Sequence, residues 1–394
     1  MNTQTKENYF LSQPHQPFFL LGIINAIVMM LLFALSYKGI LTLQIDSQAF
    51  HVYSLTYLVF SNVFTGFLFT TFPRFNQTQV IEKSYYTRLF FAQAVTSLLF
   101  ILTAFTSAIA TSFTMFLIFI TQFFIVKKLH QIYKEGQAPD KSDSFWILSA
   151  SYFGLGANAL FVIAQFFPPL LPIAINIAFY LYLIFLAFSV GQRMIPFFSH
   201  SFAQKNENFV KIIFILFLLK SIFSATELKI GEIIVDLLLA TYMAKEFLRW
   251  ELHPFKSPAI LWVLHLALAW LPLAFLLSAL SLSAELFLET SFYFLNIHLL
   301  AIGFLTTLLI GFGTRVTLGH SGQPPHGDAI ATKIFLFIQV VVLGRLLFSL
   351  NVAFGWGLGF LFDISFSLWL VLFLWWGTRY AKVLLFGTKL QKSL

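Results

Sequence analysis

Residues 17–37 of the chain read PFFLLGIINAIVMMLLFALSY and contain no charged side chain. A helix of this length rises ~1.5 Å per residue and therefore spans the ~30 Å hydrocarbon core of a bilayer. Eleven further apolar stretches of comparable length follow it. The twelve predicted spans lie near residues 17–37, 50–72, 86–105, 107–126, 144–166, 171–190, 208–224, 230–247, 259–280, 290–312, 333–352 and 357–377.

The distribution of Lys and Arg predicts how these spans are oriented. Twelve crossings place only four of the 24 Lys and Arg residues on one side, namely Lys38, Lys220, Lys229 and Arg345, and the other 20 on the opposite side. Positive charge is enriched on the cytoplasmic side of membrane proteins. A wrong number of spans would destroy this alternation, so the pattern predicts twelve spans with both termini in the cytoplasm.

Composition excludes several other classes of protein. The chain is 59% hydrophobic and only 10% charged, whereas about a quarter of the residues of a soluble domain are charged. The alternating pattern of an outer-membrane barrel is absent, so we predict an all-α, polytopic membrane helical bundle. The net charge of +8 reflects the cytoplasmic loops and does not indicate nucleic-acid binding. Because the chain has no cysteine, disulfides, thiolate metal sites and covalent c-type haem are excluded.

The loops are too short to hold a soluble domain, so we predict a single transmembrane domain over residues 1–394. Spans one to six fall within residues 1–190 and spans seven to twelve within 208–377, with cytoplasmic segments at 191–207 and 378–394. A division into six and six is common among secondary transporters. A secondary transporter or permease is therefore the alternative function, although the two halves show no match between their residues.

Charged side chains inside the membrane are costly and are normally paired. At the helical rise, Arg345 lies roughly 18 Å from the cytoplasmic side in span eleven and Asp363 roughly 21 Å from it in span twelve. We therefore predict an Arg345–Asp363 ion pair, which either clasps two neighbouring helices or lies beside a haem propionate or a proton path. Asp236, in span eight, has no obvious partner.

The nine histidines divide into loop and membrane positions. Two lie within spans, His265 about 9 Å and His298 about 18 Å from the inner side. Two imidazoles on consecutive helices are suited to a bis-histidine haem, although single buried histidines more often form ordinary hydrogen bonds. The remaining seven lie at span ends or in loops, at His15, His51, His130, His200, His253, His320 and His326.

Several strings of residues resemble the NnrS family, bacterial inner-membrane proteins described as containing haem and copper and associated with the response to nitric oxide. The similarity extends from end to end of the chain, and its most specific part is the last string. The strings are Pro17-Phe18-Phe19-Leu20-Leu21, Gly66-Phe67-Leu68-Phe69-Thr70, Arg193-Met194-Ile195-Pro196-Phe197-Phe198, Leu261-Trp262-Val263-Leu264-His265-Leu266 with Ala269-Trp270-Leu271-Pro272, and His298 through Gly303 to Gly313-Thr314-Arg315-Val316-Thr317-Leu318-Gly319-His320-Ser321-Gly322.

This resemblance implies which residues bind a cofactor. The histidines that fall on recurring positions of the family are the expected ligands of haem b or another metal, namely His51, His265, His298 and His320. It also implies that Arg315 anchors a haem propionate and that Arg193 contacts a propionate or a substrate anion. The family pattern His-x-His-Glu-Met is broken here because Tyr53 and Ser54 replace its second histidine and its acid. Copper, the second expected cofactor, is therefore less expected at the outer end, since tyrosine is a poor substitute in a copper–imidazole site.

Depth limits how the histidines combine. His51 and His320 lie at opposite faces, roughly 30 Å apart, and so do not share one iron. Two pairings stay open: His265 with His298, buried in the bundle, or His51 with His298, nearer the outer surface.

The function implied by the resemblance is a response to, or resistance against, nitric oxide at the bacterial inner membrane. The expected partners are the lipid bilayer, nitric oxide or another small diatomic ligand, and a respiratory complex or electron donor. The His-Pro-x-x-Tyr and His-His strings of haem–copper oxidases are absent, since His253-Pro254 lies in a loop. A standard respiratory catalyst is therefore disfavoured, and whether the protein is an enzyme stays open.

Overall fold

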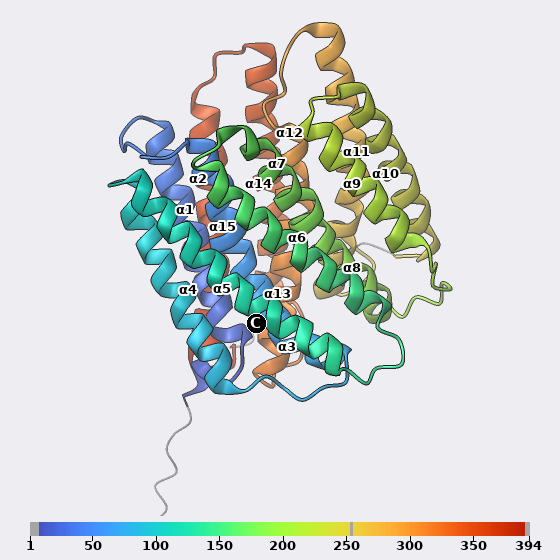
Figure 1. Cartoon of the computed structure of the whole chain (residues 1–394). Helices are drawn as coiled ribbons and strands as arrows, with labels where there is room; N and C mark the ends of the chain where they lie inside the picture. The colour runs from blue at the N-terminus through green and yellow to red at the C-terminus, as the bar shows by residue number, and fades with distance from the viewer. Residues whose placement is uncertain (1–7, 253–254, 391–394) are drawn as a thin grey trace, which may run out of the picture. The chain divides into compact units, whose positions relative to one another are not determined.

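The computed structural model describes residues 8–252 and 255–390, so His253 lies outside the described residues (Figure 1). Within these ranges the regular elements are all helical, and no strand is present. The predicted all-α class is confirmed.

Within the described residues, ten helical segments are long and apolar enough to cross a membrane, which confirms a multi-pass membrane protein. Three of them are continuous runs in which α-helix is interrupted by the π-helices η2, η4 and η5, and one of these runs begins with the short 3-10 helix η3. The ten are α1 (His15–Tyr37), α2–η2–α3 (Ser47–Phe75), α4 (Lys83–Ala104), α5 (Ala108–Glu135), α6 (Ser142–Ala164), η3–α7–η4–α8 (Pro168–Phe198), α11 (Ala259–Leu288), α12–η5–α13 (Leu295–His320), α14 (Ala329–Phe354) and α15 (Phe360–Phe386).

The two remaining long helices coincide with the seventh and eighth predicted spans. Helix α9 (Phe209–Ala225) has only 17 residues, and α10 (Lys229–Arg249) contains charged residues such as Glu232 and Asp236. On the outer face of α10, Ile234 and Leu238 are about half exposed, as expected for lipid-facing side chains. The exact count of twelve crossings and the side of the termini stay predictions.

The chain forms two compact units. Unit 1 consists of Met1–Ser144, Gly313–Pro325 and Phe373–Leu394, and unit 2 of Phe145–Phe312 and His326–Leu372. These units interleave along the sequence and do not coincide with the predicted halves 1–190 and 208–377.

In unit 1, α1 packs along η2 and α3, and α4 packs along α5. The extra residue of a π-helix disturbs the regular i→i−4 ladder, and Asn25 of α1 reaches across to it: the Asn25 Nδ2 donates to the carbonyl of Leu58 at 2.7 Å. The same amide nitrogen donates to Ser97 Oγ on α4 at 3.0 Å. Asn25 therefore joins α1 to both η2 and α4 by hydrogen bonds.

In unit 2, α9, α10 and α11 lie side by side (Figure 1), and α11 also packs on η5. Two glycines allow the close approach of α11 to the η5–α13 run. A Cβ on Gly303 would meet the Trp270 ring at 2.7 Å, and one on Gly311 would meet the Leu264 side chain at 2.7 Å.

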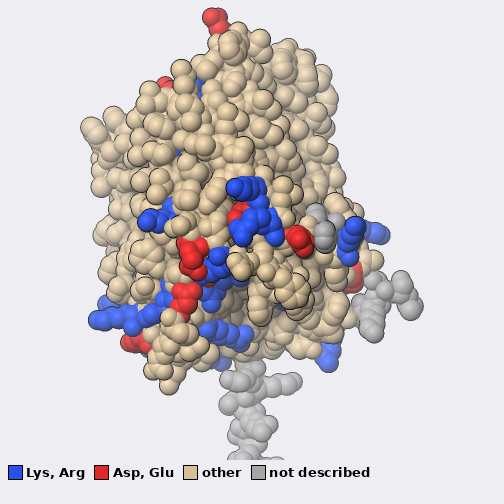
Figure 2. Space-filling model, turned by 90° about the vertical axis from the view of Figure 1, so that its right-hand side faces the viewer, with Lys and Arg blue, Asp and Glu red and all other residues tan. Residues whose placement is uncertain are grey.

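The face in Figure 2 is covered mostly by uncharged residues.

The three π-helical segments of the described residues begin at nearly equal intervals along the sequence. They are η2 (Ser54–Phe60), η4 (Ile177–Ile184) and η5 (Leu299–Thr306), which begin 123 and 122 residues apart. The motif Gly-x-Arg begins 14 residues after the start of the second π-helix and again 14 residues after the start of the third. The two motifs are Gly191-Gln192-Arg193 and Gly313-Thr314-Arg315. Within the described residues the π-helical segments thus recur at nearly one spacing, which differs from a division into two halves.

Candidate functional site

Two histidines from distant parts of the sequence meet in unit 1. His15 is the first residue of α1 and is only 1% exposed. Its ring centroid lies 4.8 Å from that of His320, the last residue of α13, with 41° between the ring planes. The Nδ1 atom of His15 is buried and has no hydrogen-bond partner among the described residues. This imidazole pair is the candidate site of unit 1.

Three of the strings that resemble the family position this pair. A Cβ on Gly66 of α3 would stand 3.1 Å from the His15 Cα and 3.0 Å from the Phe18 Cβ, so only glycine lets the backbones of α1 and α3 approach this closely. On the α13 side, the indole Nε1 of Trp376 donates to the Thr314 Oγ1 at 3.0 Å and fixes the rotation of the helix that ends at His320.

The surroundings of the pair are cationic. Arg74, in the last turn of α3, lies within electrostatic reach of both imidazoles. Thr317 precedes His320 by three residues and so shares its face of α13; its hydroxyl is buried without a hydrogen-bond partner in the described ranges. Arg315 precedes His320 by five residues, which is roughly 140° around a helix of 3.6 residues per turn. Arg315, the predicted propionate anchor, therefore projects from a different face of α13 than His320, the predicted ligand.

In unit 2, His265 of α11 lies against the end of α8. Its Nε2 is 2.7 Å from the hydroxyl of Ser199, the residue that caps α8, and His265 is 3% exposed. Arg193 lies on α8, six residues before Ser199, and is half-buried. The structure thus brings together the string that contains Arg193 and the string that contains His265.

His298 ends α12 directly before η5 and is half-buried. Its Nδ1 is 2.8 Å from the carbonyl oxygen of Phe294. A carbonyl oxygen only accepts, so Nδ1 carries the proton. The neutral ring then has its lone pair on Nε2, which is the arrangement found in histidines that ligate metals.

The structure does not bring His265 and His298 together. Leu264 of α11 faces Gly311, which places His265 level with residue 310 of the antiparallel run. His298 lies 12 residues before that level, about 18 Å along the axis at ~1.5 Å per residue. One iron cannot join two imidazoles at that separation.

His51, in the last turn of α2 in unit 1, packs against Phe33 with 4.1 Å between ring centroids and 33° between the ring planes. Tyr53, which replaces the family histidine, is buried and donates a hydrogen bond to the carbonyl oxygen of Met115 at 3.2 Å. Across residues 8–252 and 255–390, no group of three or more His, Cys, Asp or Glu side chains is placed to hold a metal ion.

The two predicted buried charges of spans eleven and twelve lie in unit 2. The Arg345 guanidinium donates to the carbonyl of Tyr293 at 2.9 Å and to the hydroxyl of Ser349, and it lies 5.1 Å from the Phe348 ring centroid. Asp363 is in the first turn of α15 and is half-buried. The Arg345–Asp363 ion pair stays a prediction.

The expectation that Asp236 has no partner is wrong. Its Oδ2 lies 2.8 Å from the Lys220 Nζ and accepts a hydrogen bond from Ser278 Oγ at 2.6 Å. Depth along single spans did not reveal this contact, because the partner is on a neighbouring helix.

Sequence analysis places His15 at the end of a span, and helix α1 does begin on it. Its burial and its contact with His320 were not predicted. The signal for a role was its position two residues before Pro17, where the first string similar to the family begins.

The fold defines a multi-pass helical membrane protein with histidines at the ends and in the interior of its helices. The model of the NnrS protein family matches residues 9–386, nearly the whole chain, and the chain therefore belongs to the NnrS family. No curated protein matches the chain at a significant level. Family membership supports a membrane protein related to the nitric oxide response.

Proposed function

We propose that this NnrS family protein acts in the response to nitric oxide through a metal centre at His15 and His320. The observation that carries the proposal is the buried imidazole pair, with its ring centroids 4.8 Å apart and an unpartnered Nδ1 on His15. A buried polar nitrogen without a partner is costly in a folded protein. A bound metal would satisfy it.

The ring separation supports copper, one of the two cofactors expected from the family, at this pair. A metal–nitrogen bond of about 2 Å puts a ring centroid about 3 Å from the ion, so two neighbouring imidazoles on one tetrahedral or square ion have centroids about 5 Å apart. Imidazoles on opposite sides of a haem iron have centroids about 6 Å apart with the porphyrin between them. The observed 4.8 Å fits copper and does not fit a haem between the rings.

The residues of the site have distinct roles in this proposal. His15 and His320 hold the ion as neutral imidazoles, and Gly66 keeps α1 close enough to α3 to fix the position of His15. Arg74 places a positive charge nearby, which favours an anion as the third ligand. Bound copper supplies redox chemistry and a coordination position for a small diatomic ligand.

For haem b, His298 is the histidine whose surroundings suit an axial ligand. The Phe294 carbonyl accepts from Nδ1 and orients the ring, so Nε2 is the nitrogen that would ligate the iron. His298 would then be the single histidine ligand of the haem, and the bound haem would supply a binding position for nitric oxide. The bacterial inner membrane and a respiratory electron donor complete this proposal, as the family resemblance implies.

Growth under a nitric oxide donor tests the function. We expect cells that express the wild-type chain to tolerate the donor better than cells that lack it. His15→Ala and His320→Ala should abolish this protection, while His326→Ala, a change of an exposed histidine, should keep it. Equal amounts of each variant in the membrane must be verified by immunoblotting. Full protection by both His15 and His320 variants would contradict the proposal.

A secondary transporter is the alternative function. The three recurring π-helical segments do not match the two halves of six on which that alternative rests. A metal-free, well-folded protein that moves a substrate into vesicles would establish the transporter.

A further inference from the structure

Three ionised side chains meet inside unit 2, where α9, α10 and α11 pack together. The Lys220 Nζ of α9 lies 2.8 Å from the Glu232 Oε2 and 2.8 Å from the Asp236 Oδ2, both on α10. Ser278 of α11 donates to the same Asp236 oxygen at 2.6 Å, and the Lys220 Nζ lies 5.7 Å from the ring centroid of Tyr180 in η4. Four elements therefore contribute to this cluster.

The cluster is buried and its charges do not balance. Lys220 and Asp236 are 0% exposed and Glu232 is 5% exposed. One ammonium and two carboxylates sum to one negative charge, which an apolar interior disfavours strongly. The neighbouring ion pair Lys229–Glu285 is itself neutral and does not compensate for it.

Two polar atoms of the cluster are buried without hydrogen-bond partners in the described part of the chain. They are the Oδ1 of Asp236 and the hydroxyl of Tyr180. Because the other carboxylate oxygen of Asp236 is already bound to Lys220 and Ser278, the Oδ1 is the atom at which a further positive charge would be held.

A metal ion does not suit this position. The ammonium of Lys220 already occupies the point between the two carboxylates, within 2.8 Å of both, and a metal ion would need several more oxygen ligands. A proton needs only one oxygen and cancels one charge. It is the cation that fits.

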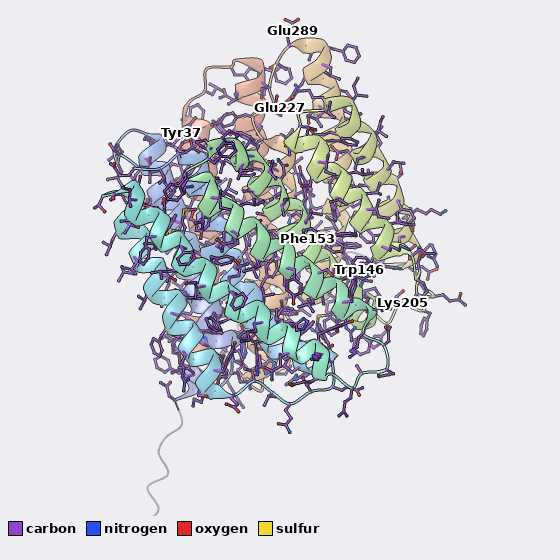
Figure 3. The ribbon with its side chains drawn as sticks, in the orientation of Figure 1. Tyr37, Trp146, Phe153, Lys205, Glu227 and Glu289 are labelled. Carbon is purple, nitrogen blue, oxygen red and sulfur yellow. The ribbon has the colours of Figure 1, made fainter. Side chains whose placement is uncertain are left out.

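The charged side chains of α10 become more exposed from the cluster toward one end of the helix. The exposed fraction of the side chain alone falls along α10, where this helix contacts α11. It is 41% for Lys229, 7% for Glu232 and 0% for Asp236. This end carries Glu227, where α9 turns into α10, whereas Lys205 marks the opposite end (Figure 3).

One turn deeper than the cluster, the packing becomes wholly apolar. Phe217 of α9, Leu239 of α10 and Phe275 of α11 are all 0% exposed, and the two phenylalanine rings are 5.7 Å apart. These side chains close the path toward the Lys205 end. A proton that enters from the Glu227 end therefore stops at the cluster.

We propose that Lys220, Glu232 and Asp236 form a proton-binding site in which the two carboxylates together hold one proton, bound at the Asp236 Oδ1, and that this proton exchanges with the aqueous face at the Glu227 end. The site does not depend on haem or copper. Tyr180 and Ser278 are polar groups of the described residues that also face it.

Infrared spectroscopy of the full-length protein in lipid nanodiscs at neutral pH tests this site. A protonated carboxylic acid has a carbonyl stretch, shifted in D₂O, that carboxylates lack. We expect the wild type to show the band of one protonated acid. Asp236→Asn and Glu232→Gln should each lose this band, because either change leaves one carboxylate that forms a neutral pair with Lys220. Lys220→Met should double the band, since both carboxylates must then be protonated.

Glu246→Gln is the matched control. Glu246 is buried on the same helix, but it is paired with Arg249 at 2.7 Å, so the band should persist unchanged. A band that is absent from the wild type, that survives Asp236→Asn or Glu232→Gln, or that disappears in Glu246→Gln would overturn the proposal. If Lys220→Met does not fold, the two near-isosteric variants still decide it.

Discussion

Gly66 controls the separation of α1 and α3 at His15. A Cβ at this position would meet the His15 Cα and the Phe18 Cβ at 3.1 and 3.0 Å, and neither atom can rotate away. We predict that Gly66→Ala destabilises the protein by about 1–3 kcal/mol through overpacking and displaces His15 from His320. Thermal unfolding in detergent, together with copper content, measures both effects.

Gly319→Ala is the control for this change. It lies next to His320, but its Cβ would meet nothing within 4 Å. Alanine favours a helix over glycine by about 1 kcal/mol, so the variant should be as stable as the wild type or more stable. Equal destabilisation by the two substitutions would contradict the role given to Gly66.

A double-mutant cycle tests the predicted ion pair between Arg345 and Asp363. If the ion pair exists, Arg345→Met and Asp363→Asn should be non-additive by about 0.5–3 kcal/mol in unfolding free energy. Additive effects would show that Arg345 is held by Tyr293 and Ser349 alone.

At the scale of elements, Trp270 links three helices of unit 2. Its ring packs against Gly303 of η5, and its Nε1 donates to the Gln339 Oε1 of α14 at 2.7 Å. Trp270→Phe leaves the Gln339 Oε1 without this donor, so we predict that the free energy of unfolding falls by about 1–3 kcal/mol. Adding Gln339→Leu should recover part of it, as measured by thermal unfolding. No recovery would mean that the hydrogen bond contributes little.

At the scale of the whole molecule, the number of crossings depends on the α9–α10 hairpin. The chain has no cysteine, so single cysteines can be introduced without further changes. If α9 and α10 cross, a membrane-impermeant maleimide added outside intact cells should label Thr226→Cys and should not label Lys205→Cys until the cells are opened. Labelling of neither position from outside would contradict the twelve-span prediction.

Sequence reasoning succeeded where a property repeats along the chain. Helical class and most spans follow from runs such as residues 17–37, because hydrocarbon thickness imposes one length on every crossing. It failed where two helices must be placed side by side. The contact of His15 with His320, the salt bridge of Lys220 to Asp236, and the 12-residue offset of His298 from His265 all depend on packing that single spans do not encode.

The π-helical segments belong to the same category. Each inserts an extra residue into a span without changing its hydropathy, so the sequence pattern gives no sign of it. The interval of 122–123 residues between η2, η4 and η5 became visible only once the hydrogen-bond ladder was known.

Metal analysis of the purified protein tests the central claim most directly. We predict about one copper ion per chain in the wild type and in His326→Ala, and at least tenfold less in His15→Ala and in His320→Ala, since even loss of a supporting residue lowers metal affinity by about 10–100-fold. Unchanged copper in both variants, or no copper in a well-folded wild-type preparation, would contradict a metal centre at His15 and His320.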